Sequence, residues 1–199
     1  LIMKRVLVIP GDGVGPEVVT AAVKVLKAAE RQYGLSLKLV TAHAGDEAAE
    51  RFGEPLPHST LELAKQVDAV LKGPVGESAA DVIVVLRRVL DLYANIRPAK
   101  SFPGVPCVKP TDLVIVRENV EGVYIGAEYM VGDVAIALKV VTSRGAVRIA
   151  KVAAEVAKKR RGRVTIVHKA NVLRVTDRLF RDKAREVLEN SGISIDEIY

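Results

Sequence analysis

Residues 5–17 read RVLVIPGDGVGPE, an apolar run that passes directly into a glycine-rich turn. The run over residues 5–10 is short and continuously apolar, as in strands buried within a parallel sheet. The glycines permit a tight turn and a close approach of backbone to a ligand, and Pro16 suits the first turn of a helix. Strand, glycine-rich loop and helix form a phosphate-binding arrangement in principle. The G-x-G-x-G spacing is not that of a dinucleotide fingerprint, so a plain strand-to-helix turn stays open.

Apolar strands and amphipathic helices continue to alternate after this turn. The apolar spacing predicts helices over residues 16–33 and 46–52 and from residue 59 onward, and strands over residues 35–44 and 68–72. This alternation is typical of an α/β fold with a largely parallel sheet.

Residues 79–100, AADVIVVLRRVLDLYANIRPAK, predict an amphipathic helix with an anion-binding side. We expect one stripe to lie in the core, formed by Val82, Val85, Leu86, Val89 and Tyr93. Arg87 lies on the neighbouring face, and Pro98 disfavours the helical conformation at Arg97, which places Arg97 just past the helix end. Two arginines so placed could bind one small anion, because each presents a planar fork that matches a carboxylate. Surface arginines, or partners of Asp81 and Asp91, are the alternative.

The composition changes after Arg97, where four prolines fall within residues 98–110. Such a stretch marks a crossing between units, so we expect two lobes, residues 1–100 and 101–199. In the second lobe the pattern predicts strands over 112–117 and 163–167, a hairpin or arm around residues 124–142, helices over 143–161 and 176–190, and a last apolar run over 193–199.

Three polar residues of the second lobe lie at or near strand ends, where α/β proteins place ligand contacts. Arg117 ends one strand, Tyr124 follows seven residues later, and Lys169 follows the strand over residues 163–167. Each has an ordinary structural alternative. Arg117 would pair with Glu118, Tyr124 would pack in a hairpin, and Lys169 would be a solvated strand end.

The composition excludes several classes of protein. A hydrophobic content of 49% with 27% charged residues, no long apolar run and no signal-like N-terminus predict a globular cytoplasmic protein without a membrane span. The net charge of +6 gathers partly in residues 158–163, where cations complement a helix dipole. Nucleic acid is a poor fit because only 4% of the residues are aromatic. Cys107, the single cysteine, is interpreted as structural.

Four pieces of the sequence, VIPGDGVGPE, LRRVLDLYANIRPAK, VIVRENVEGVYIG and HKANVLRVTD, occur in an order and spacing that resembles a known family. The chain resembles the β-hydroxyacid oxidative decarboxylases, the isopropylmalate and isocitrate dehydrogenases, over essentially its whole length. The resemblance implies the two-lobed fold of that family. It also implies that three arginines bind the substrate carboxylates, namely Arg87, Arg97 and Arg117. Tyr124 is implied as the proton donor, and Lys169 as the amine that handles the hydroxyl proton. Asn171 and Val172 are implied near the same pocket.

The resemblance also implies cofactors and partners. A nicotinamide cofactor is expected beside Val14 and Glu77, with NAD and NADP both open, and a divalent cation, Mg²⁺ or Mn²⁺, is expected at aspartates that follow Tyr199 in the family. No metal ligand is therefore assigned within this sequence. We expect a truncated dehydrogenase that lacks the C-terminal portion of the fold and has little or no activity by itself. In this family lysine and tyrosine reach one site from different subunits, which implies a homodimer with shared sites.

The substrate can be argued from the helix before Arg87. Enzymes of the isocitrate branch place Ser and Asn there, whereas this sequence has Asp81 and Ile83, with Val84 beside them. A third carboxylate against Ile83 would lose solvation without gaining a donor, at a cost of a few kcal/mol. The resemblance thus favours isopropylmalate, in leucine biosynthesis. Isocitrate, homoisocitrate and a non-catalytic subunit of the same fold stay as alternatives. Many isopropylmalate enzymes have Glu seven residues before the clamp arginine, where this sequence has Ala80. Glu77 is a candidate substitute for that Glu.

Overall fold

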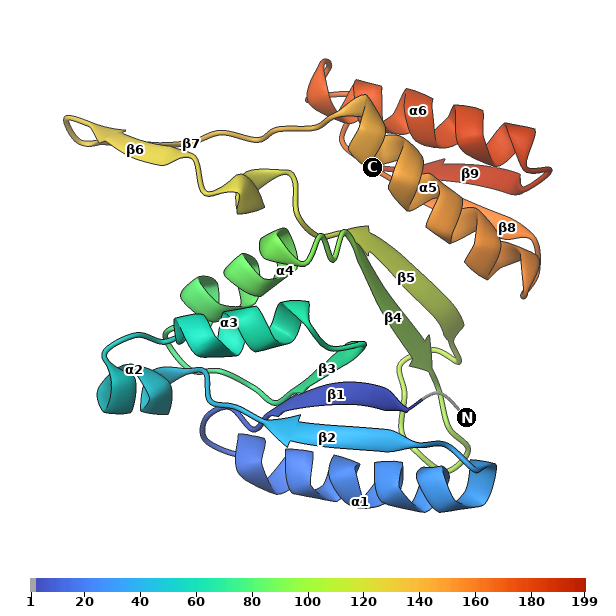
Figure 1. The fold of residues 1–199 in the computed structure, drawn as a ribbon. Helices are drawn as coiled ribbons and strands as arrows, with labels where there is room; N and C mark the ends of the chain where they lie inside the picture. The colour runs from blue at the N-terminus through green and yellow to red at the C-terminus, as the bar shows by residue number, and fades with distance from the viewer. Residues whose placement is uncertain (1–2) are drawn as a thin grey trace. The chain divides into compact units, whose positions relative to one another are not determined.

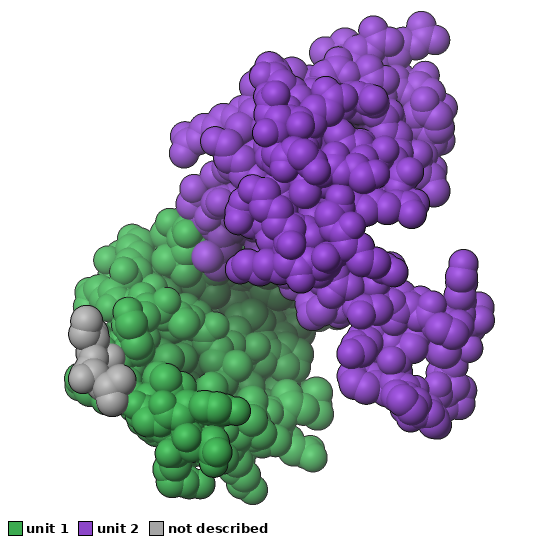
Figure 2. Space-filling model, turned by 90° about the vertical axis from the view of Figure 1, so that its right-hand side faces the viewer, with its two compact units in different colours: residues 1–90 green, residues 91–199 purple. Residues whose placement is uncertain are grey.

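The computed structural model describes residues 3–199 and divides into two compact units, Leu1–Leu90 and Asp91–Tyr199 (Figures 1 and 2). The division falls between Leu90 and Asp91, whereas the sequence places a lobe boundary after residue 100. Each unit has its own apolar core. None of the described helices is both long enough and apolar enough to cross a membrane.

The first unit is a three-stranded parallel sheet of order β2-β1-β3 with helices on both faces (Figure 1). Its elements are β1 (Lys4–Ile9), α1 (Gly15–Tyr33), β2 (Leu37–Thr41), α2 (Asp46–Phe52), α3 (His58–Lys65), β3 (Ala69–Lys72), the π-turn η1 (Ala80–Val84) and α4 (Val85–Val89). The predicted α/β fold is confirmed here. Helix α1 begins with Pro16 in its first turn and ends at Gly34, whose φ of 63° only glycine adopts readily.

The core of the first unit explains why β1 is continuously apolar. Leu7 and Ile9 are fully buried on one face of the sheet, and they form a cluster with Val82 and Leu86 from the last helical segment. Val8, on the opposite face, is also buried, because α1 covers that side (Figure 1). The strand therefore contacts helices on both faces.

The helix predicted within residues 79–100, with its end near Arg97, is shorter than expected, and its buried stripe differs. It begins as a π-turn, ends at Val89, and is followed by Asp91 with a φ of 46°. A π-turn accommodates an extra residue and so rotates the faces that follow it. Val82 and Leu86 are buried, but Val85 is 36% exposed and Val89 is 44% exposed, so the prediction for these two valines was wrong.

The second unit combines a β-ribbon, a hairpin and a parallel strand pair covered by helices. Its elements are β4 (Ala94–Lys100), β5 (Asp112–Glu118), the 3₁₀ turn η2 (Val123–Ile125), β6 (Glu128–Val131), β7 (Val134–Ala137), α5 (Ser143–Lys158), β8 (Arg163–Val167), α6 (Thr176–Asn190) and β9 (Ser194–Ile198). Strands β4 and β5 pair antiparallel, as do β6 and β7, while β8 and β9 pair parallel. The β6–β7 hairpin extends away from the α5 and α6 helices (Figure 1).

Arg97 lies within strand β4, and not just past the end of a helix as predicted. The ladder between β4 and β5 runs without interruption from Ala94 opposite Glu118 to Lys100 opposite Asp112. Pro98 is tolerated because β4 has a single neighbouring strand among the described residues, so a missing N–H need not break a central ladder. The predicted end of the helix at Arg97 was therefore wrong.

Candidate active site

Arg97 and Arg117 lie on the same face of the β4–β5 ribbon. Asn95 stands opposite Arg117 and Arg97 stands opposite Ile115. Because side chains alternate along a strand, Asn95, Arg97 and Arg117 share one face, with the two arginines as diagonal neighbours. Such neighbours are roughly 7–8 Å apart, within reach of long side chains. Two guanidinium groups thus face the same space, which suits a small dianion.

Asn95 connects this pair to the rest of the unit. Its Oδ1 accepts a hydrogen bond of 3.0 Å from Arg97 Nε, and its Nδ2 donates to Asn119 Oδ1 at 3.3 Å. Asn119 is buried and donates in turn to the Leu92 carbonyl at 3.2 Å. Arg97 is therefore held from one side of its guanidinium, which leaves its terminal nitrogens free to face a ligand.

Tyr124 lies against Arg117. Nη2 of Arg117 donates to the Tyr124 hydroxyl, and the guanidinium carbon is 5.1 Å from the centroid of the ring. The 3₁₀ turn η2 carries the tyrosine back toward the strand that it follows. The structure thus brings two of the predicted site residues into direct contact. The alternative pairing of Arg117 with Glu118 is not what the structure shows, because the Glu118 carboxylate accepts hydrogen bonds from the amides of Val120 and Glu121.

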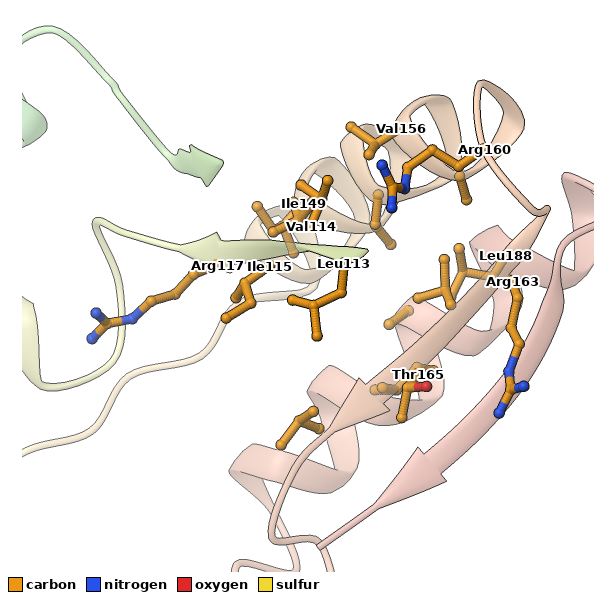
Figure 3. A pocket seen from close by; sticks show the side chains of 18 of the residues that line it. Leu113, Val114, Ile115, Arg117, Ile149, Val156, Arg160, Arg163, Thr165 and Leu188 are labelled. Carbon is orange, nitrogen blue, oxygen red and sulfur yellow. The ribbon is translucent and has the colours of Figure 1, made fainter. Parts of the chain in front are cut away.

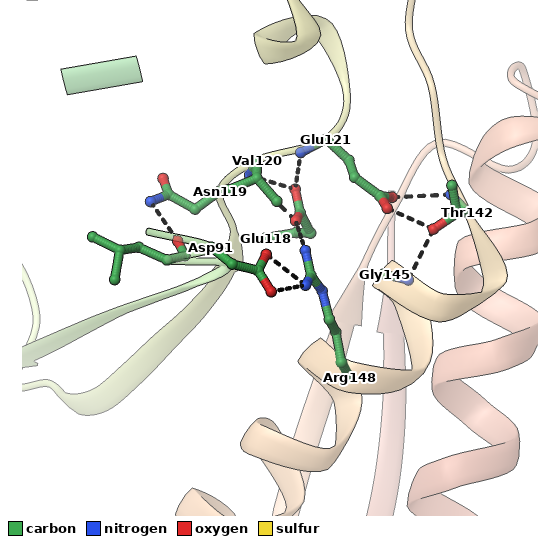
Figure 4. A network of polar contacts seen from close by, with 9 residues as sticks. Asp91, Glu118, Asn119, Val120, Glu121, Thr142, Gly145 and Arg148 are labelled. Carbon is green, nitrogen blue, oxygen red and sulfur yellow. Dashed lines mark hydrogen bonds and ion pairs between the residues drawn. The ribbon is translucent and has the colours of Figure 1, made fainter. Parts of the chain in front are cut away.

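A polar network holds the loop between Arg117 and Tyr124 (Figure 4). Glu121 receives the backbone N–H of Thr142 at 2.9 Å and also its hydroxyl hydrogen at 2.5 Å. The Thr142 hydroxyl accepts from the Gly145 amide at 2.9 Å and so caps α5. A Cβ at Gly145 would lie 2.4 Å from the Glu121 carboxylate, so the glycine leaves room for that side chain in its present position. The loop that presents Tyr124 is therefore fastened to the start of α5.

Arg148 closes the same network from α5. Its Nη1 binds both oxygens of Asp91 at 2.7 and 2.9 Å, and Nη2 lies 3.9 Å from the Glu118 carboxylate. The guanidinium also stacks over the Tyr93 ring, 4.2 Å from its centroid. Asp91 is thus the partner of Arg148, and the alternative in which it pairs with Arg97 is not observed.

Lys169 follows β8, and its side chain is exposed on a loop that Asp177 holds through the backbone. Its backbone N–H donates to Oδ2 of Asp177 at 2.8 Å. Asn171 and Val172, on the same loop, are also exposed, so the loop presents an amine, an amide and an apolar group together. These three are the predicted site residues that follow β8.

In the first unit, Arg87, Ile83 and Val84 lie on η1 and α4, and all three are partly buried. A lysine that sequence reasoning missed lies near them. Lys72 ends β3, and burial, followed by the charge of Arg87, lowers its pKa, with Asp12 opposing the shift. The signal was available, because the carboxyl end of a parallel strand is the usual place for ligand contacts. Arg87 and Lys72 therefore lie close enough for their charges to interact.

The glycine-rich turn is organised by Asp12. Its carboxylate accepts from the backbone N–H groups of Asp46, Glu47 and Gly76 at 2.9, 3.1 and 3.0 Å. A Cβ on Gly11 would lie 1.9 Å from the Pro74 carbonyl oxygen. The glycine at this position therefore serves packing against the chain's own backbone, as in the plain-turn interpretation.

The two residues predicted to border the cofactor are accessible. Val14 stands at the start of α1 with 56% of its side chain exposed. Glu77 is exposed, and its backbone is held by a 2.9 Å hydrogen bond to Asp46. An exposed apolar side chain beside an ordered loop suits a flat cofactor ring, although a site needs further contacts that these two residues do not supply.

A cavity of the second unit lies beside this site and has Arg117 in its lining (Figure 3). It has a volume of about 710 Å³ and lies between β5, α5, β8 and α6, with mostly apolar walls. Val114 and Ile149 face each other there, while the Arg117 guanidinium points away from them (Figure 3). Neither Tyr124 nor Lys169 lines the cavity. The two residues predicted to transfer protons therefore lie outside it.

The side chains of this chain were expected to hold no metal ion by themselves. Across residues 3–199, no three His, Cys, Asp or Glu side chains gather in a way that could hold a metal ion. The residues described here therefore do not fit a divalent-metal site by themselves.

Comparisons with known proteins identify the family of the chain. The family model described as isocitrate/isopropylmalate dehydrogenase matches residues 5–199. The chain is 47% identical over 196 residues to the 3-isopropylmalate dehydrogenase of Sulfurisphaera tokodaii, covering 98% of this chain and 58% of the relative. It is 45% identical over 194 residues to the isocitrate/homoisocitrate dehydrogenase of Thermus thermophilus, covering 94% and 57%.

A solved structure extends the comparison to the fold. The isocitrate dehydrogenase of Methylococcus capsulatus superposes with a TM-score of 0.88 at 40% identity, covering 98% of this chain and 60% of that one. The present chain thus spans somewhat over half the length of the relatives that it matches. The predicted resemblance and fold class are confirmed, and the chain belongs to the isocitrate/isopropylmalate dehydrogenase family.

Proposed function

We propose that the full-length protein is an NAD- and divalent-metal-dependent oxidoreductase that oxidatively decarboxylates 3-isopropylmalate in leucine biosynthesis. The observation that carries the proposal is the shared face of Arg97 and Arg117, with Tyr124 held against Arg117. Two planar cations on one face match the two carboxylates of a malate-like acid. The family membership and the names of several relatives support the same reaction.

The residues of this chain take distinct parts in the reaction. Arg97 and Arg117 bind the carboxylates and fix the orientation of the alcohol carbon, and the family resemblance implies the same role for Arg87. Holding such geometry can lower a barrier by several kcal/mol. Lys169 accepts the proton of the hydroxyl group. The nicotinamide, when bound near Val14 and Glu77, supplies the hydride acceptor.

Decarboxylation of the resulting β-keto acid leaves an enol, and Tyr124 donates the proton that this enol takes up. Arg117 holds the tyrosine hydroxyl in place for that transfer. No step is assigned here to a metal ion, because the described residues form no ligand cluster for one.

The substrate assignment depends on Ile83 and Val84. Ile83 precedes Arg87 by four positions and Val84 by three, and both would pack against an isopropyl group. A carboxylate at the same place would lose hydration without a donor. Isocitrate or homoisocitrate is the second candidate, and it is favoured by the 45% identity to a relative that is named for both acids.

The proposal includes a cytoplasmic location and a homodimer with shared active sites. A single free and exposed cysteine, Cys107, suits a reducing compartment. The β6–β7 hairpin supports the dimer, because its exposed apolar side chains would be buried by a second hairpin; they are Tyr129, Met130, Val131 and Val134.

The test is turnover by the full-length protein with 3-isopropylmalate, isocitrate and homoisocitrate, each with NAD or NADP and Mg²⁺, followed by absorbance of the reduced cofactor. The proposal predicts the highest kcat/KM for 3-isopropylmalate with NAD. A preference for either tricarboxylic acid would contradict the substrate assignment. No turnover with any acid would favour a non-catalytic subunit of the same fold.

A further inference from the structure

Asp177 is a buried carboxylate in the first turn of α6 that the proposed reaction does not use. Its exposed fraction is 7%. Oδ2 accepts the backbone N–H of Lys169 at 2.8 Å, and Oδ1 forms an ion pair with Nζ of Lys139. The two oxygens of one carboxylate therefore connect the lysine loop after β8 to a distant segment after β7.

The carboxylate is ionised in the folded protein. Burial acts to raise the pKa of Asp177, but the bonds from Lys139 and from the Lys169 amide outweigh it, so the pKa lies below its usual value. A buried charge of this kind is stable only while its partners stay in place. Loss of either partner would leave an uncompensated group in a mostly buried position.

The segment that carries Lys139 is also fastened to the tyrosine loop. Val140 and Gly122 exchange backbone hydrogen bonds of 2.8 and 3.2 Å. Thr142, two residues further on, binds the Glu121 carboxylate (Figure 4). The return segment of the hairpin, residues 138–142, thus contacts the loop of Tyr124 on one side and, through Lys139, the loop of Lys169 on the other.

We propose that Asp177, with Lys139, is a positioning residue for Lys169 that fixes the lysine loop relative to the return segment of the hairpin. The inference rests on the proposed function, in which Lys169 accepts the hydroxyl proton. Asp177 itself touches the Lys169 backbone and leaves the exposed amine free. Its effect should therefore fall on the rate of the chemical step, and much less on substrate binding.

The kinetic test uses two variants of the full-length protein. Asp177→Asn keeps an oxygen acceptor for the Lys169 amide but removes the charge that binds Lys139. Asp177→Ala removes both contacts, and misplacement of a reacting group by about 1 Å can cost on the order of 10²-fold in rate. We expect kcat to fall in the order wild type, Asn, Ala, with the Ala loss on that scale and KM for the hydroxy acid nearly unchanged.

The control variant is Glu186→Gln, on the same helix. Glu186 pairs with Lys183 on the exposed side of α6, so its loss also removes an ion pair without touching the Lys169 loop. This variant should keep wild-type kcat and KM. Thermal unfolding of all three variants verifies that each is folded at the assay temperature.

A readout that needs no substrate separates this inference from the proposed reaction. Hydrogen exchange of the Lys169 amide, measured by NMR or by mass spectrometry of peptides across residues 168–175, should accelerate in Asp177→Ala and be retained in Asp177→Asn and Glu186→Gln. Unchanged exchange at Lys169 in Asp177→Ala would overturn the inference. Accelerated exchange with unchanged kcat would overturn it too, because the contact would then be structural only.

Absence of turnover in the wild type would count against the proposed function alone. In that case the hydrogen-exchange comparison, which needs no substrate, still tests the inference. Accelerated exchange of the Lys169 amide in Asp177→Ala supports it, and unchanged exchange overturns it.

Discussion

Gly11 and Gly13 belong to one turn but have different reasons to be glycine. Both have positive φ, at 75° and 56°. A Cβ at Gly11 would lie 1.9 Å from the Pro74 carbonyl oxygen, whereas nothing lies within 4 Å of one at Gly13. Gly11 is therefore required by both its backbone conformation and its close contact, whereas Gly13 is required by its backbone conformation alone.

Gly11→Ala is expected to lower the free energy of unfolding by about 3 kcal/mol, since backbone strain adds to a backbone clash. Gly13→Ala carries the strain alone and should cost about 1 kcal/mol. Urea denaturation of the two variants measures the difference. Equal losses would show that the Pro74 contact does not constrain the turn.

Arg117→Lys tests the fork geometry of the carboxylate clamp. Lysine keeps the charge but cannot bind a carboxylate in bidentate fashion or hold the Tyr124 hydroxyl from the same position. We expect kcat/KM for the hydroxy acid to fall about tenfold or more. The control Arg163→Lys, at an exposed ion pair with Asp196, should leave kinetics unchanged. Wild-type kinetics for Arg117→Lys would remove this residue from the site.

Local spacing predicted some site residues and could not predict others. Arg117 and Tyr124 are seven residues apart along one strand and its turn, so a short motif contains both. Asp177 receives the amide of Lys169 and the amine of Lys139, and the second contact spans 38 positions. Such a partner depends on how β7 and α6 are placed in space, which neither charge nor periodicity in the sequence specifies.

At the scale of elements, the strands and long helices follow the pattern of apolar residues closely. Residues 46–52, 163–167 and 176–190 form α2, β8 and α6 with the predicted bounds. The segment 79–100 does not, because a 3.6-residue period assumes a regular helix throughout and a π-turn breaks that period. The switch from α4 to β4 occurs at Asp91, which a proline seven residues later could not indicate.

The β6–β7 hairpin makes a prediction at this scale about assembly. Met130→Lys places a charge on the exposed apolar tip, where Met130 is 63% exposed. If two hairpins bury each other, the variant should shift the full-length protein from dimer to monomer in analytical ultracentrifugation. Val25→Lys, at a 69% exposed valine of α1, is the matched control and should not change the sedimentation coefficient. An unchanged dimer in Met130→Lys would place the interface elsewhere.

For the whole molecule, the α/β class and the family were predictable because apolar strands alternate with helices and because four motifs follow in order. The division into units was placed differently, after residue 100 from the prolines and after Leu90 in the structure. Prolines indicate where a helix or central strand is disfavoured, but Pro98 lies in a two-stranded ribbon that belongs wholly to the second unit.

Acid should destabilise the chain through carboxylates whose pKa is lowered in the folded state. Burial acts to raise the pKa of Asp12. Hydrogen bonds from the backbone N–H groups of Gly76, Asp46 and Glu47 nevertheless lower this pKa below the ordinary value of 3.8. A carboxyl whose pKa is lower in the folded state contributes stability that is present above its unfolded pKa and is lost as pH falls through the folded value. The pKa of Asp177 is lowered too, so it acts in the same direction.

The free energy of unfolding is therefore expected to be nearly constant just above pH 5 and to decline as pH falls below about 4. Urea denaturation at a series of pH values measures this slope. Asp12→Asn should be less stable at neutral pH and should show a shallower decline. An identical slope in the variant would show that Asp12 does not contribute to acid lability.

The central claim is that arginines of the β4–β5 ribbon bind the carboxylates of a small hydroxy acid. A crystal structure of the full-length protein with 3-isopropylmalate tests it directly. The account predicts hydrogen bonds from Arg97 and Arg117 to carboxylate oxygens of the ligand, with Tyr124 and Lys169 near its alcohol carbon. A ligand bound away from Arg97 and Arg117 would contradict the account.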